Sequence, residues 1–392
     1  MEKARDHLFL ILSFSFSFLF SGMAHGSYVV TRFGAQADGI SDDSQAFLDA
    51  WASACGSFVP ATVYVPPGNY LLFPTAFQGP CKNSAIRFKI DGRLVASGRY
   101  TVYADAGFWV KFEGVNGVTI DGGLLEARGA VLWACKASSG NCPSGATSLL
   151  FHNAKRVTVN NLISMNSQLG HIAFNGCEDI TVNGVTVRAS GDSPNTDGIH
   201  VQQSVNIVII NTSIRTGDDC ISIGPGTQNL WIEHMACGPG HGISIGSLGK
   251  DLEEPGVENV TVKDVVLSGT QNGVRIKTWA RESNGYVRGV LFEEALMINV
   301  NNPIIIDQDY CPHNLNCPNQ GSGVKISGVK YRNIRGTSAS KVAVTFNCSP
   351  NAPCQDIRME NVELTYLNQL AQASCSHAEG SSSGVVYPQS CL

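Results

Sequence analysis

The chain has 392 residues, of which 43% are hydrophobic and 15% are charged, and its formal net charge is -5. Disorder requires low hydrophobicity together with high net charge, so this composition indicates a folded protein with a large core. Proteins that bind nucleic acid usually carry a marked basic excess, and this chain does not.

Residues 1–26 have the pattern of an export signal. Lys3 and Arg5 precede an apolar run, residues 8–20, and small residues follow as far as Gly26. A run of about 13 apolar residues is too short to span a bilayer, which disfavours a membrane anchor. We therefore expect a secreted, extracellular protein in which residues 27–392 form one domain.

The chain contains 13 cysteines, and in an exported protein these imply disulfides with at least one thiol left over. Short spacings suggest four pairs: Cys135 with Cys142, Cys311 with Cys317, Cys348 with Cys354, and Cys375 with Cys391. Cys55 with Cys81 and Cys220 with Cys237 would complete six pairs, although spacing alone does not fix the connectivity. Cys177 remains, in an apolar segment where a buried, inert thiol is expected. Zinc binding is the alternative, but the His and Cys residues do not cluster at zinc-ligand spacing. Three glycosylation sequons, at Asn211, Asn259 and Asn347, fit a secretory route.

A short run of β-branched residues beside Asn or Gly recurs along the chain. Its copies begin at Val157, Ile180, Ile207, Leu230, Val260, Val290, Val329 and Ile357, at steps of 23 to 39 residues. These steps suit a solenoid, and the short alternating strands argue against leucine-rich or helical repeats. We predict an all-β fold, a right-handed parallel β-helix with an apolar interior and outward-facing ladders of side chains.

An open solenoid exposes unpaired strand edges, so both ends need caps. Residues 43–54 could form a short amphipathic helix over the first coil. At the other end, the Ser/Gly-rich tail after Ser374 would form a cap clamped by Cys375 and Cys391. The sequence contains no linker that would divide the chain into two domains.

Four polar clusters interrupt the repeats, at residues 195–200 (NTDGIH), 217–220 (GDDC), 240–242 (GHG) and 275–277 (RIK). Asp197 and Asp219 are 22 residues apart, and His241 follows after another 22, about one coil each. We expect these three residues to stand in a file, one coil above another. Because strand side chains alternate, Arg275 and Lys277 should share the outer face while Ile276 points into the core.

Asp197, Asp218 and Asp219 would place three carboxylates close together, where they repel one another, so at least one should have a raised pKa. A protonated carboxyl beside a carboxylate supplies the acid and the base of glycoside hydrolysis. Arg275 and Lys277 could bind the carboxylate of an acidic sugar. Each cluster alone would be an ordinary turn, loop or solvated strand face, and only the combination at coil spacing indicates a catalytic site. Clustered aspartates could instead bind calcium, but the adjacent cations weigh against a metal.

The four clusters lie in the segments SPNTDGIH, TGDDCISIG, CGPGHGISIGSLG and NGVRIKTW, in that order. With these segments the chain closely resembles the polygalacturonases of glycoside hydrolase family 28, the plant branch in particular, from about Val30 to Leu392. The resemblance implies hydrolysis of α-1,4-galacturonosyl linkages in de-esterified pectin, with inversion and without a cofactor or metal. It also implies a monomer of the plant cell wall, acting on polygalacturonate, with wall inhibitor proteins as further candidate partners.

Position by position, the resemblance makes Asp218 the general acid, supported by His241, and makes Asp197 and Asp219 the residues that activate water. The implied substrate-binding residues are Asn195, Arg275, Lys277 and Tyr310. Two positions depart from the family pattern: Gly170 stands where an aromatic residue is common, and Asp309 where Asn is common. Both concern the substrate range more than the activity.

Three alternatives stay open at this point. The enzyme could act from chain ends as an exo-galacturonosidase, since loops that close one end of a groove decide this. It could be a pectate lyase, which shares the β-helix but uses calcium and β-elimination. It could also be a wall-binding protein without turnover, although intact catalytic candidates disfavour that reading.

Overall fold

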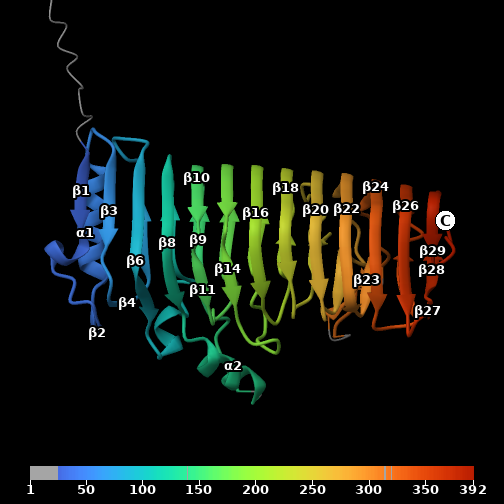
Figure 1. Ribbon diagram of the computed structural model, residues 1–392, viewed down its shortest axis with the longest axis horizontal. Coiled ribbons are helices and arrows are strands. Elements are labelled where there is room, and N and C mark those ends of the chain that lie inside the picture. The colour runs from blue at the N-terminus through green and yellow to red at the C-terminus, as the bar shows by residue number, and fades with distance from the viewer. Residues whose placement is uncertain (1–24, 139, 313–314, 319) are drawn as a thin grey trace, which may run out of the picture.

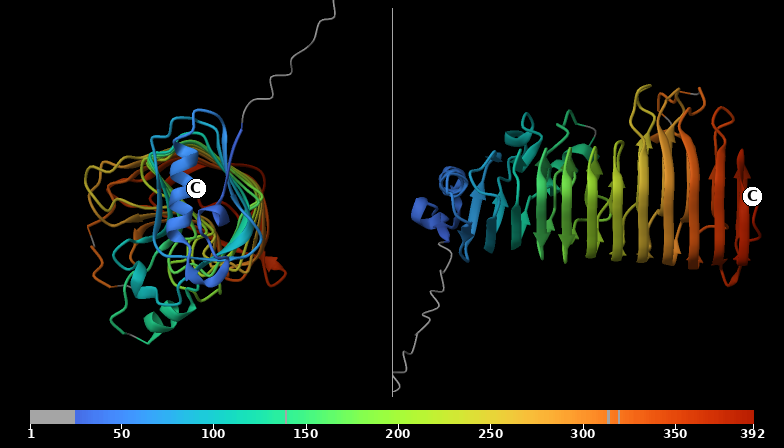
Figure 2. Two further views of the ribbon diagram at one scale, coloured as in Figure 1. Left: turned by 90° about the vertical axis from the view of Figure 1, so that its left-hand side faces the viewer. Right: turned by 90° about the horizontal axis from the view of Figure 1, so that it is seen from above.

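The computed structural model describes residues 25–392 except 139, 313–314 and 319 (Figures 1 and 2). The proposed export signal lies outside these residues, apart from its last two positions. The described chain winds into an elongated stack of coils with one 18-stranded and one 11-stranded sheet, and it forms the predicted parallel β-helix. Within the described ranges, no helix has the length and apolar character needed to cross a membrane.

The strands of the larger sheet are β1 (Gly26–Val29), β2 (Asp38–Asp42), β3 (Ala61–Val65), β4 (Asn69–Leu72), β6 (Ile86–Ala96), β8 (Val118–Glu126), β10 (Lys155–Asn160), β11 (Ile163–Met165), β13 (Glu178–Asn183), β14 (Thr186–Arg188), β16 (Val205–Arg215), β18 (Gln228–Cys237), β20 (Val257–Ser268), β22 (Tyr286–Val300), β24 (Lys325–Ser338), β26 (Cys354–Tyr366), β27 (Gln369–Leu370) and β29 (Ala378–Tyr387). The strands of the smaller sheet are β5 (Thr75–Gln78), β7 (Phe108–Glu113), β9 (Thr147–His152), β12 (Ile172–Asn175), β15 (Ile199–Gln202), β17 (Ile221–Ile223), β19 (Ile243–Leu248), β21 (Asn272–Trp279), β23 (Asn302–Tyr310), β25 (Val342–Asn347) and β28 (Gln372–Ser376). The helical segments are η1 (Val30–Phe33), α1 (Ser44–Cys55), η2 (Tyr100–Tyr103) and α2 (Ala130–Ala137).

The eight repeat positions found in the sequence lie directly opposite one another on successive strands. Val157 pairs with Ile180, Ile180 with Ile207, and the match continues without a slip to Val329 and Ile357. All eight side chains are buried. The predicted steps of 23 to 39 residues are therefore the lengths of real coils, and the differences in length are absorbed in the turns and loops.

The interior of the smaller sheet is a continuous file of apolar side chains. Phe112 stacks on Phe151 with ring centroids 5.3 Å apart, and Phe151 stacks on Phe174 at 5.1 Å. Aliphatic residues continue the file below the polar clusters, among them the fully buried Val201 and Ile223. Burial of this file fixes the strand register, because a shift by one residue would turn it to the solvent.

The predicted amphipathic helix is α1, which covers the first coil (Figures 1 and 2). Its apolar face buries Phe47 and Trp51, and the Trp51 ring lies 5.5 Å from that of Phe77. The helix therefore shields the interior of the coil stack at the amino-terminal end.

Two features differ from the sequence prediction. The tail after Ser374 does not form a separate cap but completes a last coil, in which β28 pairs with β25 and β29 pairs with β26. Its many Ser and Gly residues had concealed these strands. The sequence also gave no sign of α2, because eight residues are too few for a helical repeat of apolar positions to stand out; Figure 1 shows it projecting from the coil stack.

All six proposed disulfides are formed, and Cys177 is a buried free thiol. Burial raises the pKa of the Cys177 thiol, as expected for an inert packing residue. Five of the six bridges close loops of at most 17 residues' separation, so they fasten local turns rather than distant parts of the chain.

Candidate active site

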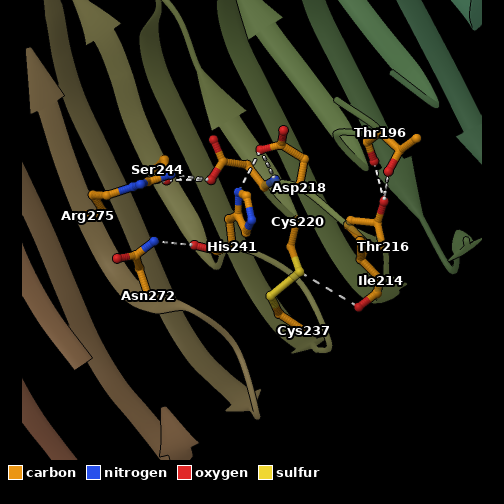
Figure 3. Close-up of a disulfide and its surroundings, with 11 residues drawn as sticks. Thr196, Ile214, Thr216, Asp218, Cys220, Cys237, His241, Ser244, Asn272 and Arg275 are labelled. Atoms are coloured by element: carbon orange, nitrogen blue, oxygen red, sulfur yellow. Dashed lines mark hydrogen bonds and ion pairs between the residues drawn. A yellow bond between two sulfur atoms is a disulfide. The ribbon is translucent and has the colours of Figure 1, made fainter. Parts of the chain in front are cut away.

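The two 22-residue steps in the sequence each correspond to one coil. Ile199, Ile221 and Ile243 are paired across β15, β17 and β19. Asp197, Asp219 and His241 each stand two residues before one of these isoleucines, so they occupy equivalent places on adjacent coils. Asn272 continues the file on the next coil, where its Nδ2 donates to the carbonyl oxygen of His241 at 3.2 Å (Figure 3).

The turn that carries Asp218 and Asp219 is tightly fixed. The Cys220–Cys237 disulfide ties its end to the last residue of β18 (Figure 3). At its start, a Cβ atom on Gly217 would lie 2.2 Å from the carbonyl oxygen of Ser193, so only glycine fits there. These restraints hold the two carboxyl groups in place before any substrate binds.

Asp219 lies in a buried cluster with two cations. Its Oδ1 accepts from Arg275 Nη2 at 2.8 Å and from Ser244 Oγ at 2.7 Å, and its Oδ2 accepts from Lys277 Nζ at 2.8 Å. Arg275 and Lys277 share the outer face of β21, and Ile276 points into the core, as the alternation of strand side chains predicts. The two cations are only 8% and 7% exposed, so their charges are directed at Asp219 rather than at open solvent.

Lys277 reaches Asp219 across two coils because the coil between them leaves room. A Cβ atom on Gly246 would lie 2.1 Å from the carbonyl oxygen of Lys277 and 3.1 Å from its Cγ. Gly246 also has a φ of +110°, which a side chain would strain. Gly246 is therefore required for the ion pair between Lys277 and Asp219.

Among the residues that the structure describes, Asp197 has no such cation partner within hydrogen-bonding distance. Its Oδ2 accepts from Ser222 Oγ at 2.5 Å, and Ser222 in turn lies 2.7 Å from His200 Nδ1. Loss of hydration raises the pKa of Asp197 to about 7, with a further contribution from the charges of Asp218 and Asp219. The sequence predicted a raised pKa from repulsion alone, whereas burial is the larger cause.

Asp218 faces His241. Its Oδ1 lies 3.0 Å from His241 Nδ1 (Figure 3) and accepts from the Asp219 backbone N–H at 2.8 Å. Its Oδ2 is 3.5 Å from Asn195 Nδ2. Burial tends to raise the pKa of Asp218, but the hydrogen bond and charge of His241, together with the charge of Lys277 and the Asp219 N–H, hold the pKa below its ordinary value. Its side chain is 17% exposed and therefore accessible from the surface.

Aromatic rings border the cationic side of the site. The Tyr310 ring centroid lies 5.2 Å from Lys277 Nζ and 6.0 Å from the Arg275 guanidinium. Trp279 packs edge-on against Tyr310 at 5.4 Å, and Arg281 lies over the Trp279 ring. Rings that face cations in this way can pack against a sugar while the cations bind its charge.

The structure brings all eight sequence-predicted site residues into one region, and it adds three that the sequence analysis missed. These are Ser222, Ser244 and Trp279. The two serines could have been found from the same 22-residue step, because His200, Ser222, Ser244 and Arg275 form one paired file. Trp279 follows Lys277 at the spacing of outward-facing side chains.

The two positions that depart from the family pattern have distinct surroundings. Gly170 stands one coil before Asp197, and a Cβ atom there would meet its nearest neighbours at 3.8 Å, so a side chain would fit. Asp309 is exposed, and its backbone N–H donates to Asp307 Oδ1 at 3.0 Å. Gly170 thus leaves space beside the acidic file, while Asp309 adds charge at the surface.

Asp218, Asp219 and His241 also present ligand atoms within 4.8 Å of one another, a spacing that a metal ion could use. Both oxygens of Asp219, however, already face Arg275 and Lys277. A divalent cation would have to displace these charges, so the donor set fits a metal poorly.

Comparisons with known proteins identify the family of the chain. The family profile described as glycosyl hydrolases family 28 matches residues 55–385. A polygalacturonase of Prunus persica is 56% identical over 97% of this chain and 98% of its own length, and an exopolygalacturonase of Platanus acerifolia is 44% identical over 92% and 96%. Among solved structures, an endo-xylogalacturonan hydrolase from Aspergillus tubingensis superposes with a TM-score of 0.78 at 19% identity, covering 92% of this chain and all of that one, and shares the fold. The chain belongs to glycosyl hydrolase family 28.

Proposed function

We propose that this protein is a polygalacturonase that hydrolyses the α-1,4-galacturonosyl linkages of de-esterified pectin. The observation that carries the proposal is the pair of neighbouring carboxyl groups with opposite pKa shifts, Asp197 and Asp218, beside the buried Asp219 cluster. Membership of family 28 and the 56% identical polygalacturonase support the same substrate class.

In the proposed mechanism, Asp197 and Asp218 share one proton as a coupled pair. Before substrate binds, the proton resides on Asp197, whose pKa is about 7. The proposed mechanism then passes this proton to Asp218, which leaves Asp197 as a carboxylate. Asp218 has the more direct route to the leaving group, because it faces His241 and the surface, and we assign it the protonation of the glycosidic oxygen. Asp197, with the anionic Asp219 behind it, then takes up a proton from the attacking water and completes an inverting displacement.

Arg275 and Lys277 serve two purposes in this proposal. They neutralise Asp219, and their remaining N–H groups are available to the carboxylate of a galacturonosyl unit. Arg has five such donors and Lys three, so one bond to Asp219 does not exhaust either. Tyr310 and Asn195 border the same surface and would contact the sugar ring.

We further propose that the protein is secreted and works in the plant cell wall on polygalacturonate as a monomer. The six disulfides and the amino-terminal signal pattern support an oxidising, extracellular setting. The net charge of -5 does not prevent binding to a polyanion, since distant charges are screened over about 8 Å at physiological salt while Arg275 and Lys277 act at contact distance.

The test is hydrolysis of polygalacturonate by the secreted protein, followed by release of reducing ends and by NMR of the first-formed anomer. We expect saturated products of inverted configuration, unaffected by a calcium chelator, and slow cleavage of fully methyl-esterified pectin. Chelator-sensitive formation of unsaturated products would identify a lyase instead. Binding without any cleavage would identify a wall-binding protein.

A further inference from the structure

A partly exposed tryptophan lies on the outer face of the larger sheet, whereas the active site belongs to the smaller one. Trp231 of β18 is 40% exposed, and its Nε1 donates to Glu233 Oε2 at 3.0 Å. Its partner on the next coil is Thr261. Together with Asn229 and Asn259 it lines a shallow depression of about 240 Å³. An indole face surrounded by amides and hydroxyls matches a sugar ring, which has an apolar face and a polar rim.

The amides beside Trp231 form a ladder along one corner of the coils. Asn206 Nδ2 donates to Asp179 Oδ1 at 2.9 Å, Asn229 to Asn206 at 3.0 Å, and Asn259 to Asn229 at 2.7 Å. The three asparagines have positive φ angles of 61°, 55° and 56°. Asn tolerates this conformation better than most residues, which accounts for the recurring Asn.

The ladder ends at Asn259. The equivalent place on the next coil is Gly289, since the residues on either side of these two are paired. Gly289 has no side chain, and a Cβ atom there would come no closer than 3.6 Å to Asn259. The last amide of the ladder is therefore exposed, with open space on one side and Trp231 on the coil at its other side.

Asn259 begins the sequon Asn259-Val260-Thr261. We propose that Asn259 carries an N-linked glycan whose first N-acetylglucosamine packs over Trp231. The Nδ2 atom that would hold the sugar already points toward the tryptophan coil, through its bond to Asn229. After glycosylation this nitrogen keeps one hydrogen, so the ladder bond can persist.

The other two sequons lack this combination of space and a receiving ring. Asn211 has the side chain of His234 at the equivalent place on the next coil, paired at 3.2 Å with Asp264. Asn347 is followed by Cys348, which is tied in a six-residue disulfide loop. We expect a glycan at Asn259 to be ordered, and one at either other site to extend freely.

The first part of the test is the mass of glycopeptides from the full chain secreted by plant or yeast cells. Thr261→Ala removes the sequon but keeps the Asn259 ladder bond, and Thr261→Ser is the matched control that keeps both. We expect the glycan on Asn259 in the natural protein and in Thr261→Ser, and its loss in Thr261→Ala. An unmodified Asn259 in a chain glycosylated elsewhere would overturn the proposal.

The second part measures whether the sugar contacts the tryptophan. Trp231→Ala should lower the Tm of the glycosylated protein by about 1–3 °C more than it lowers the Tm of the Thr261→Ala protein. Trimming the glycan to its first sugar should preserve this difference. Equal Tm changes in the two backgrounds, or a difference lost on trimming, would contradict the contact. Reduced binding of polygalacturonate by Trp231→Ala would assign Trp231 to polymer docking and would also overturn it.

Discussion

The coils that carry Asp197 and Asp219 are neighbours in the stack, yet the two aspartate carboxyl groups have very different surroundings. Each aspartate stands two residues before a buried isoleucine on paired strands. Asp219 forms ion pairs with Arg275 and Lys277, each at 2.8 Å. Asp197 receives only the Ser222 hydroxyl, and burial raises its pKa to about 7. The repeat thus fixes where a carboxyl group stands, and the residues arriving from later coils decide its charge.

The difference has a chemical consequence. A site with three anions would repel a polyanionic substrate, and a site with three neutral acids would have no base. In the proposed mechanism two cations offset the charge of Asp219, and Asp197 holds a proton that it can pass to Asp218.

The largest expected effect is on the rate of hydrolysis, when the proposed general acid Asp218 is removed. Asp218→Asn should reduce polygalacturonate hydrolysis by at least about 10²–10⁴-fold, the contribution of general acid catalysis, while leaving polymer binding intact. Initial rates and binding to immobilised polygalacturonate would be measured beside Asp264→Asn, an exposed control. Near-normal turnover by the folded variant would exclude Asp218 from this role.

A second substitution tests whether Asp219, unlike Asp197, contributes to stability through its ion pairs. Asp219→Asn leaves Arg275 and Lys277 buried without their counter-charge, and breaking a buried ion pair in this way costs about 3–5 kcal/mol. Chemical unfolding at pH 7 should show this loss in the free energy of unfolding. The matched variant Asp197→Asn removes no ion pair and should not show it. Equal destabilisation of the two variants would contradict the proposed difference between them.

Lys277→Met tests the cationic side of the same cluster. We expect at least a tenfold loss of activity on polygalacturonate, because a charge-assisted contact contributes about 1.5–3 kcal/mol. Lys325→Met, at an exposed lysine on β24, serves as the control. The ratio of activities on de-esterified and partly esterified pectin corrects for any unfolded fraction. If that ratio stays unchanged, Lys277 does not bind the substrate carboxylate.

The smallest effect concerns the pH dependence of stability. In the unfolded chain Asp197 loses its proton near its ordinary pKa of 3.8, but in the folded protein it keeps the proton up to about pH 7. The folded state therefore binds more protons between these values, and the stability contributed by this group falls as the pH rises from about 4 to 7. Asp197→Asn should flatten this slope in a series of Tm measurements, and an unchanged slope would contradict the raised pKa.

Much of the fold could be predicted because it depends on periodic features. The β-branched runs set the register from Val157 to Ile357, and short cysteine spacings indicated four of the six disulfides. In contrast, α2 is too short to show a period, and β29 of the last coil is rich in Ser and Gly and has β-branched residues only at Val385 and Val386. A sequence pattern detects buried alternation, and neither segment has it.

In the site, too, periodic features could be predicted from the sequence and other features could not. The places of Asp197, Asp219 and His241 were predictable from the 22-residue steps, because one step equals one coil. The partner of Asp219 was not, since Lys277 reaches it only past Gly246, two coils along. Side-chain length and the room left by a glycine have no signature in strand spacing, so the sequence suggested free cations where the structure has a buried ion cluster.

The most direct test of this contrast is a carboxyl ¹³C NMR titration of the protein labelled at aspartate, compared among the natural protein, Asp197→Asn and Asp219→Asn. We predict one aspartate that titrates near pH 7 in the natural protein, is absent from Asp197→Asn and is still present in Asp219→Asn. If every aspartate titrated below about pH 5, or if the high-pH titration disappeared with Asp219 rather than Asp197, the assignment of the proton to Asp197 would be wrong.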